Sequence, residues 1–285
     1  MYSETIKLII AGLVAGTIYS CGPSETERQQ AQAAGIIEAA KQLEAEGQYV
    51  QALEAVNSID SLCPKALDAR KEAHVMKPQL MLNVTAQELQ LADSTMVASE
   101  IRADELMKEL SVVKAPYESF YGYTKLNGVS PLTTPGIYGQ LSLQGLVFHL
   151  TASGKGSSYD VRVRITDRTS GESVETSLIT YDNERNRLAD NGLQIITLTE
   201  AESAPLGAFV SAHRNSELWL GIITAGGKAW SNTPISDTQI QGVATLYEIL
   251  EQRRTYNSCK ARKEHLTQKL TVLRNQLGEF ADSER

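Results

Sequence analysis

MLNVTAQELQLADSTMVASEIRADELMKELSVV, residues 81–113, carries an apolar side chain at every seventh position and contains neither glycine nor proline. A seven-residue apolar repeat is typical of a long helix that keeps one side against a partner helix. The stretch therefore predicts a long helix that pairs with a second helical segment elsewhere in the chain. The repeat consists of Leu82, Leu89, Met96, Ala103 and Leu110.

The best partner for this helix lies at residues 237–280. Ser236 and Gln239 have the spacing of a capping box, which marks a helix start, and the leucines that follow alternate at four and three residues. Because a separate segment joins the two helices, we expect an antiparallel stalk. The two helices could pair within one chain, or two chains could pair as a coiled coil, so the oligomeric state stays open. A shift of the helix register by one heptad also stays open. The predicted register pairs Leu110 with Ile249, Ala103 with Tyr256, Met96 with Lys263, Leu89 with Leu270 and Leu82 with Leu277.

Between these helices, the period of the apolar residues changes. Val161, Val163 and Ile165 alternate with polar residues, as in a half-buried strand. Similar segments separated by turn-forming glycines and asparagines predict six or seven short strands without intervening long helices. Such a set implies an antiparallel β-sandwich or barrel inserted into the stalk. The other expected strands are residues 146–150, 174–181, 193–198, 208–212 and 218–224.

The segment before the stalk helix predicts a helical hairpin. Small residues lie where two helices would touch, Gly47 and Tyr49 lie at the turn, and Pro64 ends the second helix. This segment resembles one tetratricopeptide repeat, with Ile36 in place of the usual large aromatic. The resemblance implies an interaction scaffold, and a generic antiparallel hairpin fits equally well. Pro78 predicts either a helix restart or a bend within one continuous helix.

The N-terminus has the features of a secretion signal. Residues 8–18 are apolar, which is too short a run to span a bilayer of about 30 Å but suits the core of a signal peptide. The residues Ile18-Tyr19-Ser20-Cys21 resemble the lipobox of bacterial lipoproteins, and the chain resembles small helical-repeat lipoproteins of Bacteroidetes-type bacteria. That resemblance implies acylation of Cys21 and, because Gly22 follows, anchoring in the outer membrane. An ordinary signal peptide and an uncleaved anchor stay open.

The net charge and the lack of known site motifs argue against several classes of function. A net charge of −7 argues against a nucleic-acid partner, which needs concentrated Lys and Arg. Cys21, Cys63 and Cys259 are too widely spaced for a zinc site or a disulfide framework, and we expect Cys63 and Cys259 to be unpaired. The four histidines show no ligand spacing, and no phosphate loop, nucleophile elbow or calcium loop occurs. We therefore predict no catalytic residue, metal or cofactor.

Aromatic residues of the inserted domain are the candidate ligand-binding residues. They could line a glycan or peptide groove, although an aromatic cluster also suits the joint between two domains. Three arginines of the same domain could meet an anion, although exposed strands also carry arginine for edge protection. The candidates are Tyr117, Tyr121, Trp219 and Trp230, and the arginines are Arg162, Arg164 and Arg168.

The sequence thus predicts an α+β, non-enzymatic envelope lipoprotein, anchored to a membrane by N-terminal acyl chains. Its expected role is that of a scaffold or adaptor for another envelope protein. The alternatives are capture of a glycan or small ligand by the β domain, and a hydrolase whose site assembles only on folding. The predicted parts are a signal peptide (1–20), a polar linker (21–29), a helical hairpin with the long stalk helix (30–115), a β domain (116–236), a C-terminal stalk helix (237–280) and a tail (281–285).

Overall fold

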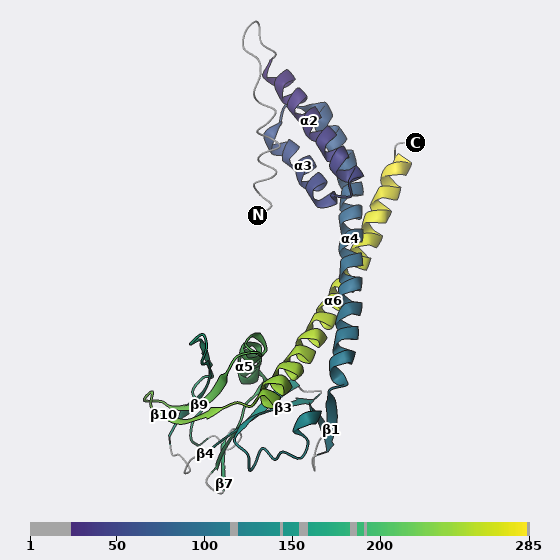
Figure 1. Ribbon diagram of the computed structural model, residues 1–285. Coiled ribbons are helices and arrows are strands. Elements are labelled where there is room, and N and C mark those ends of the chain that lie inside the picture. The colour runs from purple at the N-terminus through teal and green to yellow at the C-terminus, as the bar shows by residue number, and fades with distance from the viewer. Residues whose placement is uncertain are drawn as a thin grey trace. The chain divides into compact units, whose positions relative to one another are not determined.

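The computed structural model describes residues 24–114, 119–142, 145–153, 159–182, 187–190 and 193–283 (Figure 1). Its fold is α+β, with long helices and two antiparallel sheets. The described chain divides into two compact units, one formed by residues 24–90 with 264–283 and the other by residues 91–263. Two helices, α4 (Leu67–Met107) and α6 (Asp237–Ser283), contribute residues to both units.

The first unit begins with a helical hairpin made of α2 (Glu25–Ala45) and α3 (Tyr49–Leu62). Ser24 and Glu27 form a capping box, in which each side chain accepts a hydrogen bond from the backbone N–H of the other. Because this box satisfies N–H groups that a helix start leaves unpaired, the helix already begins at Glu25. The prediction of a polar linker over residues 21–29 is therefore wrong for residues 25–29.

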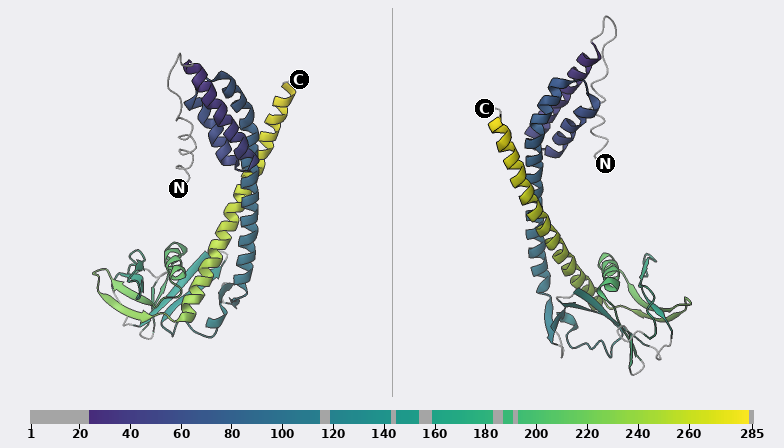
Figure 2. Two further views of the ribbon diagram at one scale, coloured as in Figure 1. Left: turned by 45° about the horizontal axis from the view of Figure 1, so that its top comes forward. Right: turned by 180° about the vertical axis from the view of Figure 1, so that it is seen from behind.

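The hairpin packs against the first part of α4. Gly47 turns the chain between α2 and α3 at a φ of 74°, a left-handed conformation that costs glycine little. Both views in Figure 2 show the hairpin along α4, and the Asn83 amide donates to Glu44 of α2 at 3.3 Å. Pro78 lies inside α4, which agrees with the continuous-helix alternative. The buried residues are Ala33, Ile37, Ala40, Ala52, Val56, Ile59, Cys63, Ala66, Ala69, Ala73 and Leu80.

In the second unit, α4 and α6 lie side by side and antiparallel (Figures 1 and 2). Asp93 pairs with Lys263 at 2.5 Å, and Arg102, further along α4, pairs with Glu248, which is earlier on α6, at 2.7 Å. These contacts confirm antiparallel pairing within one chain for this unit. Lys263, predicted to lie opposite Met96, forms its ion pair with Asp93, which is three residues earlier on α4.

The end of α4 differs from the prediction. The helix stops at Met107, and β1 (Leu110–Lys114) follows. The β-branched Val112 and Val113 favour a strand, and β1 pairs antiparallel with β2 (Ser119–Tyr123), which places Val112 opposite Tyr121. Leu110 therefore packs from a strand against the core of the second unit, and the prediction of helix up to residue 115 is wrong beyond Met107.

The larger sheet has six antiparallel strands in the order β1-β2-β3-β4-β8-β7. Its edge strands are β1 and β7, so the described strands form no closed sheet, and the predicted β-sandwich or barrel is not confirmed. A short 3₁₀ turn, η1 (Thr124–Leu126), follows β2. The remaining strands are β3 (Gly136–Ser142), β4 (Gly145–Ser153), β7 (Arg187–Asp190) and β8 (Leu193–Thr197).

The smaller sheet has the order β10-β9-β5-β6 and is also open. Its centre is β5 (Val161–Asp167), the strand that the alternating pattern predicted, which lies beside β9 (Leu218–Thr224). The strand expected over residues 174–181 is only β6 (Ser173–Glu175), with Ile179 forming an isolated bridge to Val161. The other edge is β10 (Ala229–Pro234).

Residues 208–212, predicted as a strand, belong instead to α5 (Glu200–Ala212). A capping box between Thr199 and Glu202 starts this helix. The buried Ser203 hydroxyl accepts the backbone N–H of Phe148 at 3.0 Å, which fixes α5 against β4. The helix is therefore determined by its cap and by its packing on the sheet, and the expectation of a domain without long intervening helices is wrong here.

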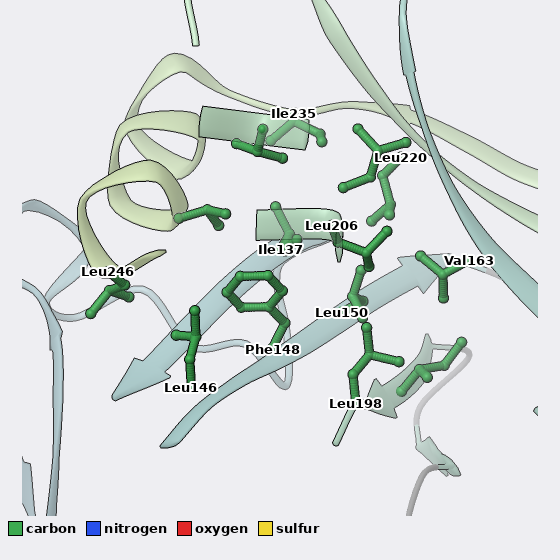
Figure 3. Close-up of a cluster of buried hydrophobic side chains, with 14 of the residues drawn as sticks. Ile137, Leu146, Phe148, Leu150, Val163, Leu198, Leu206, Leu220, Ile235 and Leu246 are labelled. Carbon is green, nitrogen blue, oxygen red and sulfur yellow. The ribbon is translucent and has the colours of Figure 1, made fainter. Parts of the chain in front are cut away.

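The core of the second unit lies between the sheets, α5 and α6. Figure 3 shows the Phe148 ring among Ile137, Leu146 and Leu206, and Phe148 is fully buried. Burial of such a side chain contributes about 1.5–3 kcal/mol. This core holds one face of β5 and β9 inward. On their other face, Arg162, Arg164, Thr166 and Trp219 are half-buried, whereas Gly221 and Ile223 are buried.

Candidate functional site

The structure places the predicted ligand-binding residues in different parts of the chain. Tyr121 lies on β2 of the six-stranded sheet, and Trp219 lies on β9 of the four-stranded sheet. Trp230 is in β10, but its side chain lies outside the described part of the structure, as do Tyr117 and Cys21. The two described aromatics therefore belong to separate sheets, and only Trp219 shares a sheet face with the predicted arginines.

The outer face of the four-stranded sheet collects the candidate residues. Val163 and Ile165 of β5 point into the core, so Arg162 and Arg164, which alternate with them, point outward. The strand register places Arg164 opposite Gly221 of β9 and Thr166 opposite Trp219. We name this surface the arginine–tryptophan face and define it as Arg162, Arg164, Thr166, Arg168, Trp219 and Gly221.

Arg168 and Trp219 form the central contact of this face. The guanidinium carbon of Arg168 lies 4.5 Å from the centroid of the Trp219 ring, a cation–π arrangement. The indole N–H donates to the Glu217 carboxylate at 2.8 Å. One side of the ring is thus covered and its only donor is satisfied, so Trp219 serves as a support for Arg168 more than as an open stacking platform.

The three arginines differ in what they contact. Arg164 forms an ion pair across the strands with Glu175 of β6. For the guanidinium N–H groups of Arg162 and Arg168, no hydrogen bond or ion pair is present within the described ranges. A guanidinium carries five N–H donors in a planar fork that matches a carboxylate. Arg162 and Arg168 therefore offer the face two unfilled donor groups.

Gly221 lies on the outer face opposite Arg164 and is itself buried. A Cβ built on Gly221 would meet nothing closer than the backbone oxygen of Arg164 at 3.7 Å. Any other residue type here would place side-chain atoms on the outer face between Arg164 and the paired Asn232 of β10.

A histidine and two carboxylates lie next to the face. The Nδ1 atom of His213, which caps the C-terminus of α5, lies 2.9 Å from Oδ2 of Asp167, and its Nε2 atom lies 3.2 Å from Oε2 of Glu172. The Phe209 ring stacks on the imidazole with centroids 4.3 Å apart. Both ring nitrogens are engaged by carboxylates, so this arrangement leaves no nitrogen to act as a general base on a substrate.

The buried Asp167 organises the turn between β5 and β6. Burial would raise the pKa of Asp167, but hydrogen bonds from the Thr169 backbone N–H, from His213, and from Ser170 and Ser216 outweigh it. They hold the pKa of this carboxyl well below its usual range. The carboxylate thus stays ionised and fixes the turn that carries Arg168, which makes the histidine cluster a support for the face.

Only the turn half of this support could be recognised from sequence. Asp167 begins a turn that contains Ser170 and Gly171, a residue with a φ of 78°, and an Asp at such a position is a signal for a side chain that binds turn N–H groups. His213 is 46 residues away in the chain, and no spacing rule links it to Asp167. Only the packing of α5 beside β6 brings the two together.

Metal sites and membrane-spanning helices are both absent from the described ranges. No group of three or more His, Cys, Asp or Glu side chains there is arranged to hold a metal ion. No helix in the same ranges has both the length and the apolar character to cross a bilayer. Cys63 and Cys259 are both free thiols, as predicted.

Comparison of the chain with protein-family models, with curated proteins and with solved structures found no match.

Proposed function

We propose that this protein is a non-enzymatic adaptor of the bacterial cell envelope, tethered to a membrane by acylation of Cys21, whose β strands bind another protein. The arginine–tryptophan face is the proposed binding surface. The observation that carries the proposal is the contact of Arg168 with Trp219. It holds the Arg168 guanidinium over the indole ring, and within the described ranges neither this guanidinium nor that of Arg162 on the same face has a hydrogen bond or ion pair.

This geometry favours a protein partner over the alternative of glycan capture. A neutral sugar ring stacks on an open aromatic ring, whereas the guanidinium of Arg168 lies over the ring of Trp219. Tyr121, the other described aromatic candidate, lies in the other sheet. Tryptophan and arginine are both enriched among the central residues that contribute most of the binding energy of protein interfaces.

A hydrolase is also less well supported. Within the described ranges, a convergent group of histidine and carboxylates joins both ring nitrogens of His213 to Asp167 and Glu172. A general base needs a nitrogen within hydrogen-bond reach of the proton that it removes. The cluster instead hydrogen-bonds the turn that carries Arg168, which suits a preformed binding surface.

Site-directed photo-crosslinking in intact cells tests the proposal. A photoreactive amino acid replaces Ser173, which is exposed on the outer face opposite Thr166. We expect a discrete crosslinked protein that disappears when Arg162 and Arg168 are both changed to glutamine. The matched control places the photoreactive residue at the exposed Asp104 of α4. The same product from both positions, or a product that survives the double change, would contradict the proposal.

A further inference from the structure

We infer that α4 carries a second binding surface, on the side turned away from α6, and that this surface docks a basic amphipathic helix of a partner protein. The inference goes beyond the proposed function, because the surface is separate from the arginine–tryptophan face. It is carried by exposed apolar side chains at helical spacing and by unpaired carboxylates beside them. We name this surface the α4 outer face and define it as Leu91, Ser94, Val97, Ala98 and Ile101.

Three large apolar side chains of the α4 outer face are exposed. Leu91 is 64 % exposed, Val97 44 % and Ile101 55 %. At 3.6 residues per turn they fall within about 120° of the helix circumference, which is the width of the apolar stripe that a surface helix normally buries. Single exposed apolar residues are common on proteins, whereas a group of them on one side of a helix marks a surface that a partner covers.

The residues of this face have the spacing of a helix–helix contact. Leu91, Ser94, Ala98 and Ile101 follow one another at intervals of three, four and three residues, which is the a and d spacing of a coiled coil. The opposite side of the helix is buried, as at Ala92. Figures 1 and 2 show α6 along that side, and no other described element of the second unit along the outer one. A helix is therefore the element whose side chains fit this face.

Unpaired carboxylates line one margin of the α4 outer face. Glu100 and Asp104 are exposed, and within the described ranges neither carboxylate has a hydrogen bond or an ion pair. Arg102 is the only basic residue between positions 91 and 107, and it is bound to Glu248 of α6. A partner helix that carries Lys or Arg beside its apolar row complements this negative margin.

The same charges argue against a second copy of this chain as the occupant. Residues 91–109 include five acidic and two basic residues. One of the two basic residues, Arg102, is bound to Glu248, and the other, Lys108, follows the end of α4. Two α4 outer faces placed together would join surfaces of the same sign, and like charges that face each other weaken association.

A lipid surface is also a poorer occupant than a basic helix. Helices that lie on a membrane carry Lys and Arg beside their apolar row, because anionic headgroups attract these side chains. The headgroups would instead repel the carboxylates of Glu100 and Asp104. The charge of the margin therefore favours a protein helix.

Peptide binding to the purified full-length chain tests the inference, with fluorescence anisotropy of a labelled peptide as the readout. The probe is an end-blocked peptide of three heptads, with Leu at positions a and d, Lys at e and g, and Ala or Gln elsewhere. The matched control peptide has Glu in place of every Lys. Like charges at e and g keep each peptide from pairing with itself, so both are added as monomers.

We expect the Lys peptide to bind at least about tenfold more tightly than the Glu peptide, and its binding to weaken as salt rises. The double change of Leu91→Gln with Ile101→Gln should weaken binding at least about tenfold, because it removes the apolar row. The double change of Glu100→Gln with Asp104→Asn should weaken it about fivefold, because it removes the negative margin.

Matched control variants separate loss of the surface from a general effect of substitution. Leu132→Gln removes an exposed leucine from another part of the second unit, and Glu54→Gln removes an exposed carboxylate from α3. Both should leave binding of the Lys peptide unchanged. Circular dichroism confirms that each variant is folded.

Equal binding of the two peptides, or binding that survives the double change of Leu91 and Ile101, would overturn the inference. A dimer of the chain, or binding to phosphatidylglycerol vesicles, that this double change abolishes would also overturn it, because a second copy or a lipid surface would then cover the face.

The outcome is independent of the proposed function. Arg162→Gln with Arg168→Gln should leave peptide binding unchanged, so failure of the peptide test would leave the arginine–tryptophan face as the proposed surface. A photoreactive residue at Asp104 reports on the α4 outer face, and any product from it should differ from the product at Ser173.

Discussion

Asp167 and His213 are joined by a hydrogen bond of 2.9 Å that connects the end of β5 to the end of α5. Asp167 is 2 % exposed, and its second oxygen accepts the Thr169 backbone N–H at 2.7 Å. A single carboxylate thus fixes both the turn before β6 and the terminus of a helix. Its protonation would weaken all of these hydrogen bonds together.

Stability should therefore fall in acid because of Asp167. The pKa of its carboxyl in the folded state lies below the unfolded value of about 3.9. Its contribution is present above the unfolded value and is lost as the pH falls through the folded one. We expect Asp167→Asn to be less stable than the original protein at pH 7 and to lose less stability on acidification to pH 3, as measured by urea unfolding. The control is Asp104→Asn, at an exposed position on α4. A decline identical to that of the unchanged protein would rule out this role for Asp167.

Two helical glycines should respond to alanine with opposite signs. A Cβ on Gly207 of α5 would lie 2.8 Å from the Tyr247 ring and 3.2 Å from Phe148, whereas one on Gly35 of α2 would meet nothing within 4 Å. Gly207→Ala should cost about 1–3 kcal/mol of unfolding free energy, since overpacking exceeds the gain in helix propensity. Gly35→Ala should stabilise by up to about 1 kcal/mol. Urea denaturation monitored by circular dichroism measures both, and a stabilised Gly207→Ala would show that α5 does not pack as described.

Glu248 should couple α4, α5 and α6. It accepts from Arg102 of α4 at 2.7 Å and from Arg214, just after α5, at 3.4 Å. Glu248→Gln should cost about 1–2 kcal/mol, because two guanidinium groups lose a partly buried carboxylate. Glu105→Gln, whose contact with Arg102 is 3.6 Å and exposed, should cost less than about 0.5 kcal/mol. In a double-mutant cycle, Arg102→Met should cost less when Glu248 is already Gln. Additive effects would argue against the coupling.

Acylation of Cys21 is tested by metabolic labelling with a palmitate analogue. Cys21→Ala should lose the label and leave the membrane fraction, because attached acyl chains supply the expected anchor. Cys259→Ala is the matched control, because this cysteine is a free, half-buried thiol. Label that persists in Cys21→Ala would refute the lipoprotein prediction.

Much of the local structure could be predicted because its causes lie within a few residues. The capping boxes at Ser24 with Glu27 and at Ser236 with Gln239 form as their spacing indicates. The alternation in β5 and the antiparallel pairing of the long helices in the second unit follow from apolar periodicity. The start of α5 was also readable in principle, because Thr199 and Glu202 have the same capping spacing.

Tertiary contacts overrode local patterns at two places. Leu110 fits the heptad repeat, yet it lies in β1, because pairing with β2 and packing on the core outweigh one more turn of helix. Residues 208–212 are apolar enough for a strand, yet α5 packs them against β4. In both cases the decisive contacts come from segments distant in sequence, which a local pattern does not contain.

The sequence alone determined which residues point outward on β5 and which helices pair. The apolar period of a strand or helix and the capping boxes at helix starts both depend on residues that are close in sequence. The tertiary structure decided that Arg168 lies on Trp219 and that His213 reaches Asp167. Those contacts depend on β5 and β9 being neighbours and on α5 ending beside the β5–β6 turn. Such neighbours are chosen by burial of the shared core, a property of the whole unit rather than of any single stretch.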